Sequence, residues 1–446
     1  MPPILATTGD TAAHSVYLLD GETGVSSGSL RMIPQMFFHR TSEVREFCGS
    51  LLLMRSTPAL LLILLSVARA ADGPLLDGMD AATFSSRDPK LTIELVEGKV
   101  GQALQFSFRD MAQSVFGFGR FRGAPEWDKA AGFSFWVKGD GSQNLGGLQF
   151  VWGEDYKQRY DFAFPISETE WTKVVVRWRD LVPVLPAAPI NVENGNAPSK
   201  LGQLWFGKWW YWRHYPPASY AIDEIRLEPI LPAETSVPAA GAPLARVAAK
   251  LRAGQPVTVV TMGDSLTDFE HWANKTVNWP TDLKLNLRKE FKSDVTVVNP
   301  AIGGTQLGQN LVLMPRWLAT TPQPDLVTVC FGYNDWDAGM RGERFLQLQK
   351  DAVERIRRAT GGKADVLLIT SCPALERWTT MGELADAARN AAAQTGAGLA
   401  DIERAFHDVP EAERAQLFSR DKTHLGPAGH RLVAATVIEA IKQAAR

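Results

Sequence analysis

Residues 257–266 read VTVVTMGDSL, and this stretch decides the fold. The first six residues form an apolar run that is typical of a buried strand. A Gly-Asp pair, which favours a turn, precedes Ser265, and Leu266 can begin a helix, so the sequence predicts a strand-to-helix turn at Ser265. Open α/β sheets bind ligands at the carboxyl ends of their strands, and a helix N-terminus favours negative charge. A serine hydroxyl there can attack a carbonyl carbon if a base lies nearby.

A base with a suitable partner occurs far downstream. Residues 421–424 read DKTH, which places the Asp421 carboxylate three residues before the His424 imidazole. One turn of chain lets the two side chains meet, and the carboxylate can then hold the imidazole in the tautomer whose free nitrogen accepts a proton from Ser265. His430 is a rival base, but it has no carboxylate three residues before it and is expected on the last helix.

Two further segments follow predicted strands and are expected at the same edge of the sheet. Residues 299–305 read NPAIGGT and follow the run 295–298, and residues 332–335 read GYND and follow the run 326–330. A glycine amide and an asparagine side-chain amide placed there can both donate to a developing oxyanion. Losing one such donor typically costs about 3–4 kcal/mol of activation free energy.

These four segments, in this order, resemble the four sequence blocks of the SGNH or GDSL hydrolases. The matching blocks are GDSL at 263–266, the glycine block at 299–304, GxND at 332–335 and DxxH at 421–424. Any one block recurs by chance, but four in the right order, each after a predicted strand or near the chain end, form a specific signal. The resemblance covers about residues 245–446.

The resemblance implies a role for each candidate site residue. It makes Ser265 the nucleophile, His424 the base and Asp421 the acid that orients this base. Gly303 and Gly304 compete for one donor position, and Gly304 is preferred because it stands five residues after the first residue of its block, as in the family pattern. The implied oxyanion donors are the Ser265 amide, the Gly304 amide and the Asn334 side chain.

Beyond a Pro- and Ala-rich linker at 231–243, strand and helix patterns alternate, which predicts a parallel sheet with helices on both faces. The resemblance implies the flavodoxin-like, three-layer form of this α/β fold, and the hydrolase domain is expected over 244–446. Predicted strands lie near 257–262, 295–298, 325–331, 365–370 and 398–400. Predicted helices lie near 244–253, 281–292, 343–359, 382–395 and 426–444.

Residues 54–70 have the features of a secretory signal peptide in the expected order. A short region with one arginine opens at Met54, an apolar run follows over 59–67, and a small-x-small pattern predicts cleavage after Ala70. The apolar run is too short for a comfortable membrane span. We therefore expect a secreted or periplasmic protein with no stable membrane span after processing. Since a signal peptide starts a protein, we interpret residues 1–53 as a non-native upstream extension.

Residues 72–230 have the pattern of an all-β sandwich, with short strand patterns separated by turn signals. The run FWVKGDG at 135–141, the tryptophan-flanked strand at 171–178 and the segment 220–225 resemble β-jelly-roll domains of the galactose-binding type, some of which are carbohydrate-binding modules. Aromatic side chains crowd residues 205–215. They could stack on a sugar ring, but burial in a core is the favoured interpretation because large aromatic side chains are usually buried.

The composition excludes several classes of function. The 446 residues suffice for two or three domains with cores, and a formal net charge of −2 gives no basic excess that would point to nucleic acid. Neither Cys330 nor Cys372 stands in a spaced metal or disulfide pattern, so both are expected as buried free thiols. The scattered histidines show no zinc-ligand spacing. No metal and no organic cofactor is expected.

The predicted function is that of a secreted serine esterase, which hydrolyses carboxylic esters through an acyl-enzyme intermediate. A sugar-binding domain beside an esterase favours O-acetyl groups on a carbohydrate, so the expected partner is a small-molecule or polysaccharide ester. A lipase, lysophospholipase or thioesterase of the same family is the first alternative. A catalytically inactive carbohydrate-binding protein is the second, and the four intact blocks argue against it.

Overall fold

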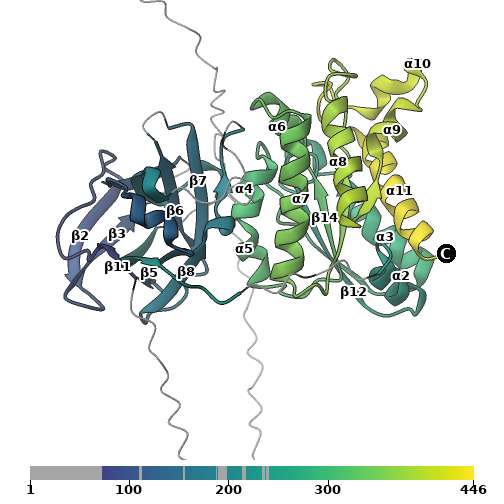
Figure 1. Cartoon of the computed structure of the whole chain (residues 1–446). Coiled ribbons are helices and arrows are strands. Elements are labelled where there is room, and N and C mark those ends of the chain that lie inside the picture. The colour runs from purple at the N-terminus through teal and green to yellow at the C-terminus, as the bar shows by residue number, and fades with distance from the viewer. Residues whose placement is uncertain are drawn as a thin grey trace, which may run out of the picture. The chain divides into compact units, whose positions relative to one another are not determined.

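The computed structural model describes residues 73–109, 113–153, 156–186, 188, 198–212, 217–233, 237 and 241–446. The predicted upstream extension at 1–53 and the predicted signal peptide at 54–70 lie outside these residues, as does part of the predicted linker at 231–243. No helix in the described part of the chain is both long and apolar enough to cross a membrane. The described residues form an N-terminal β-sandwich and a C-terminal α/β domain (Figure 1).

The N-terminal region is an antiparallel β-sandwich, as predicted. One sheet has the strand order β2-β3-β11-β5-β8, with β1 paired to β11, and the other has the order β4-β10-β6-β7-β9. The strands of the first sheet are β1 (Leu75–Asp77), β2 (Leu91–Glu97), β3 (Gln102–Phe108), β5 (Gly132–Lys138), β8 (Thr172–Arg177) and β11 (Ala218–Glu228). Those of the second are β4 (Val115–Arg120), β6 (Leu145–Trp152), β7 (Gln158–Pro165), β9 (Val182–Pro183) and β10 (Leu201–Lys208).

Aromatic side chains fill the space between the two sheets. Phe135 from one sheet meets Phe164 and Phe206 from the other, with ring centroids 5.1 and 5.6 Å apart and ring planes close to perpendicular. Such edge-to-face pairs add specific attraction to the large apolar area that each ring buries. In the aromatic segment of the sequence, Trp209, Tyr211 and Trp212 are buried, in line with the packing interpretation, whereas Trp210 is 47 % exposed.

The α/β domain has a parallel sheet with the strand order β13-β12-β14-β15-β16. This order, with the second strand at the edge beside the first, is that of flavodoxin-like folds and confirms the predicted class. The strands are β12 (Val257–Gly263), β13 (Val295–Val298), β14 (Leu326–Cys330), β15 (Asp365–Ile369) and β16 (Gly398–Ala400). The helices are α2 (Ala245–Arg252), α3 (Trp279–Phe291), α4 (Leu307–Val312), α5 (Met314–Leu318), α6 (Tyr333–Asp337), α7 (Gly342–Ala359), α8 (Gly382–Thr395), α9 (Ile402–His407), α10 (Glu411–Arg414) and α11 (Pro427–Ala444).

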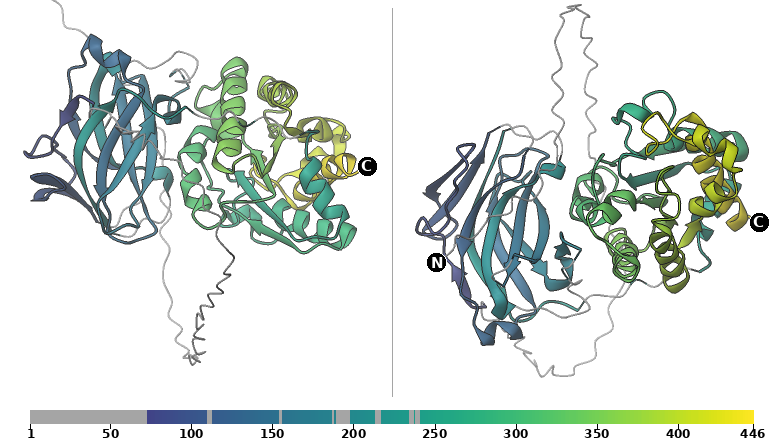
Figure 2. Two further views of the ribbon diagram at one scale, coloured as in Figure 1. Left: turned by 60° about the horizontal axis from the view of Figure 1, so that its bottom comes forward. Right: turned by 90° about the horizontal axis from the view of Figure 1, so that it is seen from above.

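Helices cover both faces of this sheet (Figures 1 and 2). Along β12, Val257 and Val259 pack in one cluster with buried residues of α2, α3, α9 and α11. Val260 and Met262 pack in a second cluster with residues of α4, α5, α7 and α8. Because strand side chains alternate between faces, a run of apolar residues such as 257–262 requires a helical layer on each side. All five predicted strands and five of the helices lie close to their predicted positions.

Candidate active site

Ser265 follows the carboxyl end of β12, but the predicted helix after it is wrong. The main-chain carbonyl of Asp264 accepts hydrogen bonds from the amides of Thr267 and Asp268, both at 3.0 Å, and its carboxylate accepts one from Leu266, also at 3.0 Å. These bonds close a single turn that does not continue as a helix. The Asp264 side chain thus takes the amide of Leu266, two residues on. Side-chain hydrogen bonds of this kind are the reason that aspartate favours turns over helix interiors. Ser265 therefore gains no helix dipole.

The structure brings Ser265, His424 and Asp421 together in one chain of hydrogen bonds. The Nε2 atom of His424 lies 2.9 Å from Oγ of Ser265, and its Nδ1 atom lies 2.6 Å from Oδ2 of Asp421. The two polar contacts use the two ring nitrogens, so a proton on Nδ1 leaves Nε2 free to accept the serine proton. The structure thus brings together the three residues that the sequence analysis named, and their catalytic roles stay a prediction.

The Asp421 carboxylate is held by several donors. Its Oδ1 atom accepts from the hydroxyl of Ser419 at 2.8 Å and from the amides of Thr423 and His424 at 3.1 and 3.0 Å. Partial burial alone would raise the pKa of Asp421, but these donors and the His424 ring together hold this pKa well below its usual range. The carboxylate is thus ionised throughout the neutral range and can stabilise an imidazolium.

The rival base His430 does not reach the site. It lies on α11, as expected, and is fully buried, with its Nδ1 atom accepting a hydrogen bond from the amide of Trp279 at 3.3 Å. Burial, together with the nearby rings of His271 and His424, lowers the pKa of His430 to about 4. A neutral, enclosed imidazole of this kind serves packing and hydrogen bonding.

A hydrogen bond separates the two competing glycines. The amide of Gly303 donates to Oδ2 of Asp268 at 2.8 Å, so this N–H group already has an acceptor. In the described part of the chain, the amides of Gly304 and Ser265 donate to no acceptor. Gly304 has a φ of +78°, a conformation that glycine adopts without strain. This backbone leaves the Gly304 amide available to a ligand, which favours the choice of Gly304 over Gly303.

Asn334 is positioned by the turn between β14 and α6. Its Nδ2 atom donates to the carbonyl of Thr305 at 3.0 Å and makes a longer contact of 3.4 Å with Oδ2 of Asp264. The shorter bond fixes the orientation of the amide. The second N–H group makes only the weak contact, so it can donate to a substrate oxygen that approaches it without a change in the orientation of the amide. Asn334 and Gly304 both line the same cavity as Ser265.

The cavity at Ser265 has a volume of about 360 Å³ and is open to solvent at His424. One aliphatic side chain, that of Leu266, lines it. The lining residues are Ser265, Leu266, His271, Gly303, Gly304, Tyr333, Asn334, Cys372, Thr423 and His424. The residues that carry the three predicted oxyanion donors, Ser265, Gly304 and Asn334, therefore all line this cavity.

Sequence reasoning missed His271 as a neighbour of His424. The ring of His271 stacks on that of His424, with centroids 4.2 Å apart, and the ring of Trp272 lies 5.8 Å from it. Trp272 is 50 % exposed, and the guanidinium of Arg420 lies 5.6 Å from its ring centroid. No sequence spacing connects residues 271 and 424, so only the folded chain could reveal this contact.

Two buried carboxyl groups lie beneath the site. Burial raises the pKa of Asp264 and that of Asp335 to about 7. The charge of Asp268 adds to the rise at Asp264, and the charge of Asp264 adds to the rise at Asp335. Asp264 contacts the Asn334 amide, and Asp335 accepts a hydrogen bond from the amide of Leu307 at 3.1 Å. Each carboxyl group therefore contacts a residue in or next to a loop that carries a predicted oxyanion donor. Within the described residues, no three His, Cys, Asp or Glu side chains are placed to hold a metal ion.

Solved structures resemble each half of the chain. An acetylxylan esterase from Geobacillus stearothermophilus is 18% identical, with a TM-score of 0.35, and the match covers 42% of this chain and 94% of that chain. A family 11 carbohydrate-binding module from Clostridium thermocellum is 15% identical, with a TM-score of 0.31, covering 37% of this chain and 99% of that chain. A Bacillus subtilis protein is 14% identical, with a TM-score of 0.36, covering 81% of this chain and 90% of that chain.

Sequence comparisons bear on the α/β domain. Curated protein sequences give no match. A family model described as GDSL-like Lipase/Acylhydrolase family matches residues 261–432 and confirms the predicted resemblance. Residues 261–432 therefore form a GDSL-like lipase/acylhydrolase domain, the catalytic part of a carboxylic ester hydrolase.

Proposed function

We propose that this protein is a serine esterase that removes O-acetyl groups from a carbohydrate. One observation carries the catalytic part of the proposal: Oγ of Ser265 lies 2.9 Å from Nε2 of His424, in a cavity lined by available N–H donors. That distance lies within the reach needed for a base to take the proton of a nucleophile.

The proposed reaction has two halves. The hydroxyl oxygen of Ser265 attacks the ester carbonyl while Nε2 of His424 takes its proton, and the amides of Ser265, Gly304 and Asn334 donate to the oxyanion. The tetrahedral species collapses, and the alcohol leaves with the proton from His424. Water then attacks the acyl-enzyme in the same way, which releases acetate and restores the serine. Asp421 keeps the imidazole oriented and stabilises its charged form.

The lining of the cavity favours a short acyl group. A long acyl chain needs an apolar channel, whereas Leu266 supplies the one aliphatic side chain among the residues that line this cavity. The alcohol side of the ester would lie near His424, next to the half-exposed ring of Trp272. An indole face of this kind can cover the apolar face of a sugar ring, which supports a carbohydrate as the alcohol.

Acetate release from a panel of acetylated polysaccharides tests this function. We expect release by the wild-type protein and none by Ser265→Ala, because the variant lacks the nucleophile. The exposed Ser85→Ala serves as the matched control and should behave as wild type. Ester hydrolysis by Ser265→Ala near the wild-type rate would refute the assigned nucleophile.

The alternative of a lipase, lysophospholipase or thioesterase predicts a preference for long acyl chains. Hydrolysis of nitrophenyl acetate and nitrophenyl decanoate separates the two proposals. We expect kcat/KM to be higher for acetate, since Leu266 is the one aliphatic side chain that lines the cavity and could pack against a ten-carbon chain. A higher value for decanoate would favour the lipase. The second alternative, an inactive carbohydrate-binding protein, predicts glycan retention with no turnover of either ester.

We also propose that the protein is secreted or exported to the periplasm. It is supported by the charge, apolar run and small-x-small pattern within residues 54–70. N-terminal sequencing of the natural product is the test, and we expect the mature chain to begin at Ala71. A mature protein that begins upstream of Met54 would contradict both the cleavage site and the interpretation of residues 1–53.

A further inference from the structure

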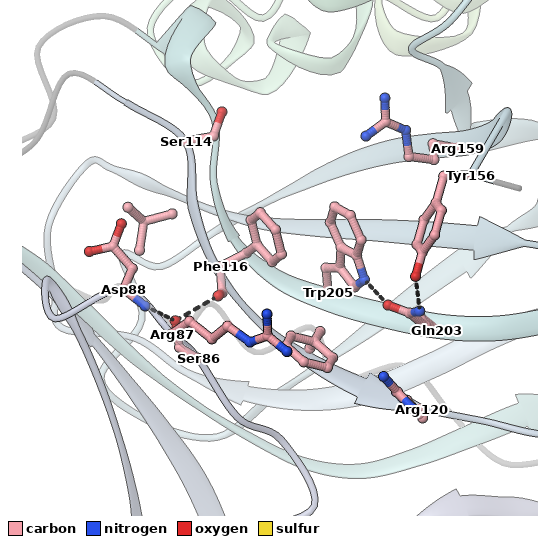
Figure 3. A pocket seen from close by; sticks show the side chains of 12 residues that line it. Ser86, Arg87, Asp88, Ser114, Phe116, Arg120, Tyr156, Arg159, Gln203 and Trp205 are labelled. Atoms are coloured by element: carbon pink, nitrogen blue, oxygen red, sulfur yellow. Dashed lines mark hydrogen bonds between the residues drawn. The ribbon is translucent and has the colours of Figure 1, made fainter. Parts of the chain in front are cut away.

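A second and larger cavity lies on the β-sandwich (Figure 3). Its volume is about 580 Å³, within the range of small-molecule sites, and it shares no lining residue with the cavity at Ser265. The walls combine aromatic rings with charged and hydroxyl groups. The lining residues are Ser86, Arg87, Asp88, Ser114, Val115, Phe116, Phe118, Arg120, Tyr156, Arg159, Gln203 and Trp205.

The alternation of strand β4 explains why these side chains point outward. A Cβ atom at Gly117 or Gly119 would lie within 3 Å of phenyl rings of the sandwich core, so these two positions face inward and must stay small. The intervening residues Phe116, Phe118 and Arg120 then face the cavity, because side chains alternate along a strand. The packing of the core thus sets out one wall of the site.

A row of three aromatic rings stands in the cavity. The ring of Trp205 is stacked on that of Phe116, with centroids 4.1 Å apart and planes 2° apart, and the ring of Tyr156 lies 6.2 Å away on a tilt (Figure 3). Gln203 ties the row together, since it accepts from Nε1 of Trp205 at 2.7 Å and donates to the hydroxyl of Tyr156 at 2.9 Å. The ring of Tyr156 remains 42 % exposed, so part of this apolar surface is open to a ligand.

The charged groups around the row are mainly cationic. Three arginines, Arg87, Arg120 and Arg159, and one acid, Asp88, line the cavity. Asp88 is partly engaged, as its Oδ1 atom accepts from the amide of Lys90 at 2.9 Å. Within the described residues none of the three arginines forms an ion pair, and Nε of Arg159 is buried with no hydrogen-bond partner. Three guanidinium groups without an ion pair at one cavity wall favour a ligand that carries an anionic acceptor.

We propose that this cavity binds an acidic saccharide, a stretch of sugar units that carry carboxylate groups, as uronic acids do. Guanidinium groups match carboxylates with paired N–H donors, and three of them favour an anion over a neutral ligand. The aromatic row packs against the apolar faces of the sugar rings. The choice of a saccharide among anions rests on the proposed function, and it narrows the substrate to an esterified polysaccharide with acidic units.

Calorimetric titration of the full chain with unesterified tetrasaccharides tests this site without any turnover. The probes are tetragalacturonate, which carries carboxylates, and the neutral xylotetraose and cellotetraose. We expect tetragalacturonate to bind at least tenfold more tightly than either neutral probe. The double variant Arg87→Gln/Arg120→Gln should lose at least tenfold in this affinity, and its hydrolysis of nitrophenyl acetate should stay at the wild-type rate. Lys129→Gln, an exposed lysine outside the cavity, is the matched control.

Three results would overturn the proposal. Equal affinity for acidic and neutral probes, which includes binding of none, would remove the role of the arginines. Full affinity of the double variant for tetragalacturonate would place the binding elsewhere. Tighter binding of a single-stranded tetranucleotide would identify a different class of anion. These binding measurements involve no acetate release. A protein that binds tetragalacturonate but releases no acetate would contradict the esterase proposal alone, and the reverse result would contradict the binding proposal alone.

Discussion

At the scale of single residues, the chemistry depends on which N–H groups keep no internal acceptor. The motifs located Ser265 and Asn334, but counting along the chain alone favoured Gly304 over Gly303. The structure supplies the physical basis for preferring Gly304. The amide of Gly303 donates to Asp268, a residue 35 positions away in the sequence, and this hydrogen bond forms only when the chain folds. The stacking of His271 on the histidine has the same origin. Residue types and their order suggest which groups react, and that stays a prediction. The contacts that position these groups are tertiary, so the sequence alone does not show them.

The side chain of Asn334 offers the sharpest residue-level prediction. Asn334→Ala removes one oxyanion donor, so kcat for nitrophenyl acetate should fall by about 100- to 1000-fold, while KM changes little because the lost contact forms in the transition state. Steady-state kinetics measures both constants. Asn286→Ala, at an exposed position of α3, should leave kcat unchanged. A comparable loss in the control, or a rise in KM that accounts for the whole effect, would contradict the assigned role.

At the scale of elements, long periodic segments were predictable and short ones were not. Strand β12 and helices α7 and α11 show runs or spacings that directly reflect burial, and the sequence predicts each within about two residues. Helices α4, α5 and α6 have five or six residues, too few for a clear period, and depend on packing. The helix expected after Ser265 does not form, because the Asp264 carboxylate accepts a hydrogen bond from the amide of Leu266 and stabilises a turn.

The turn between β14 and α6 holds Asn334 in place and depends on Gly332. This residue has a φ of +152°, and an added Cβ atom would lie 2.2 Å from Oγ of Ser371. Gly332→Ala should therefore lower the free energy of unfolding by roughly 1–3 kcal/mol, as measured by urea denaturation. At Gly382, the first residue of α8, a Cβ atom meets nothing within 4 Å. Gly382→Ala should change stability by no more than about 0.5 kcal/mol, and an equal loss in both variants would argue against the steric cause.

At the scale of the whole molecule, the order of strand and helix patterns along the sequence predicted the architecture. The sequence did not predict which carboxyl groups are buried. A run of strands followed by alternating strands and helices predicts a sandwich and a parallel sheet. Nothing local distinguishes Asp161 from an exposed aspartate, yet it is buried between Tyr211 and Gln149, which both donate to it. Long-range packing decides such environments, and a single sequence does not display it.

These buried acids make stability depend on pH. Burial raises the pKa values of Asp161, Asp264 and Asp335 to about 7, against about 3.9 in an unfolded chain. The folded state then binds more protons, so its stability is greatest below the unfolded pKa and falls as pH rises through about 7. The melting temperature should drop between pH 5 and pH 8. Calorimetry of Asp161→Asn should show a slope smaller by roughly a third, since one of three such groups is gone.

The exposed Asp408→Asn provides the control for this measurement and should keep the wild-type slope. A melting temperature that rises from pH 5 to pH 8 in the wild-type protein would contradict the direction. An unchanged slope in Asp161→Asn would remove this group from the explanation.

The two described cysteines lie against the reaction centre, since Cys372 lines the cavity at Ser265 and Cys330 ends the adjacent strand. Burial raises the pKa of Cys330 to about 12 and that of Cys372 well above its ordinary value. Both sulfur atoms therefore stay protonated at neutral pH and make poor nucleophiles. Iodoacetamide should neither alkylate the native enzyme nor slow it, and mass spectrometry should find both sites modified only after denaturation. An enzyme whose cysteines are buried and protonated should stay active in the presence of oxidants and electrophiles that would modify an exposed thiolate.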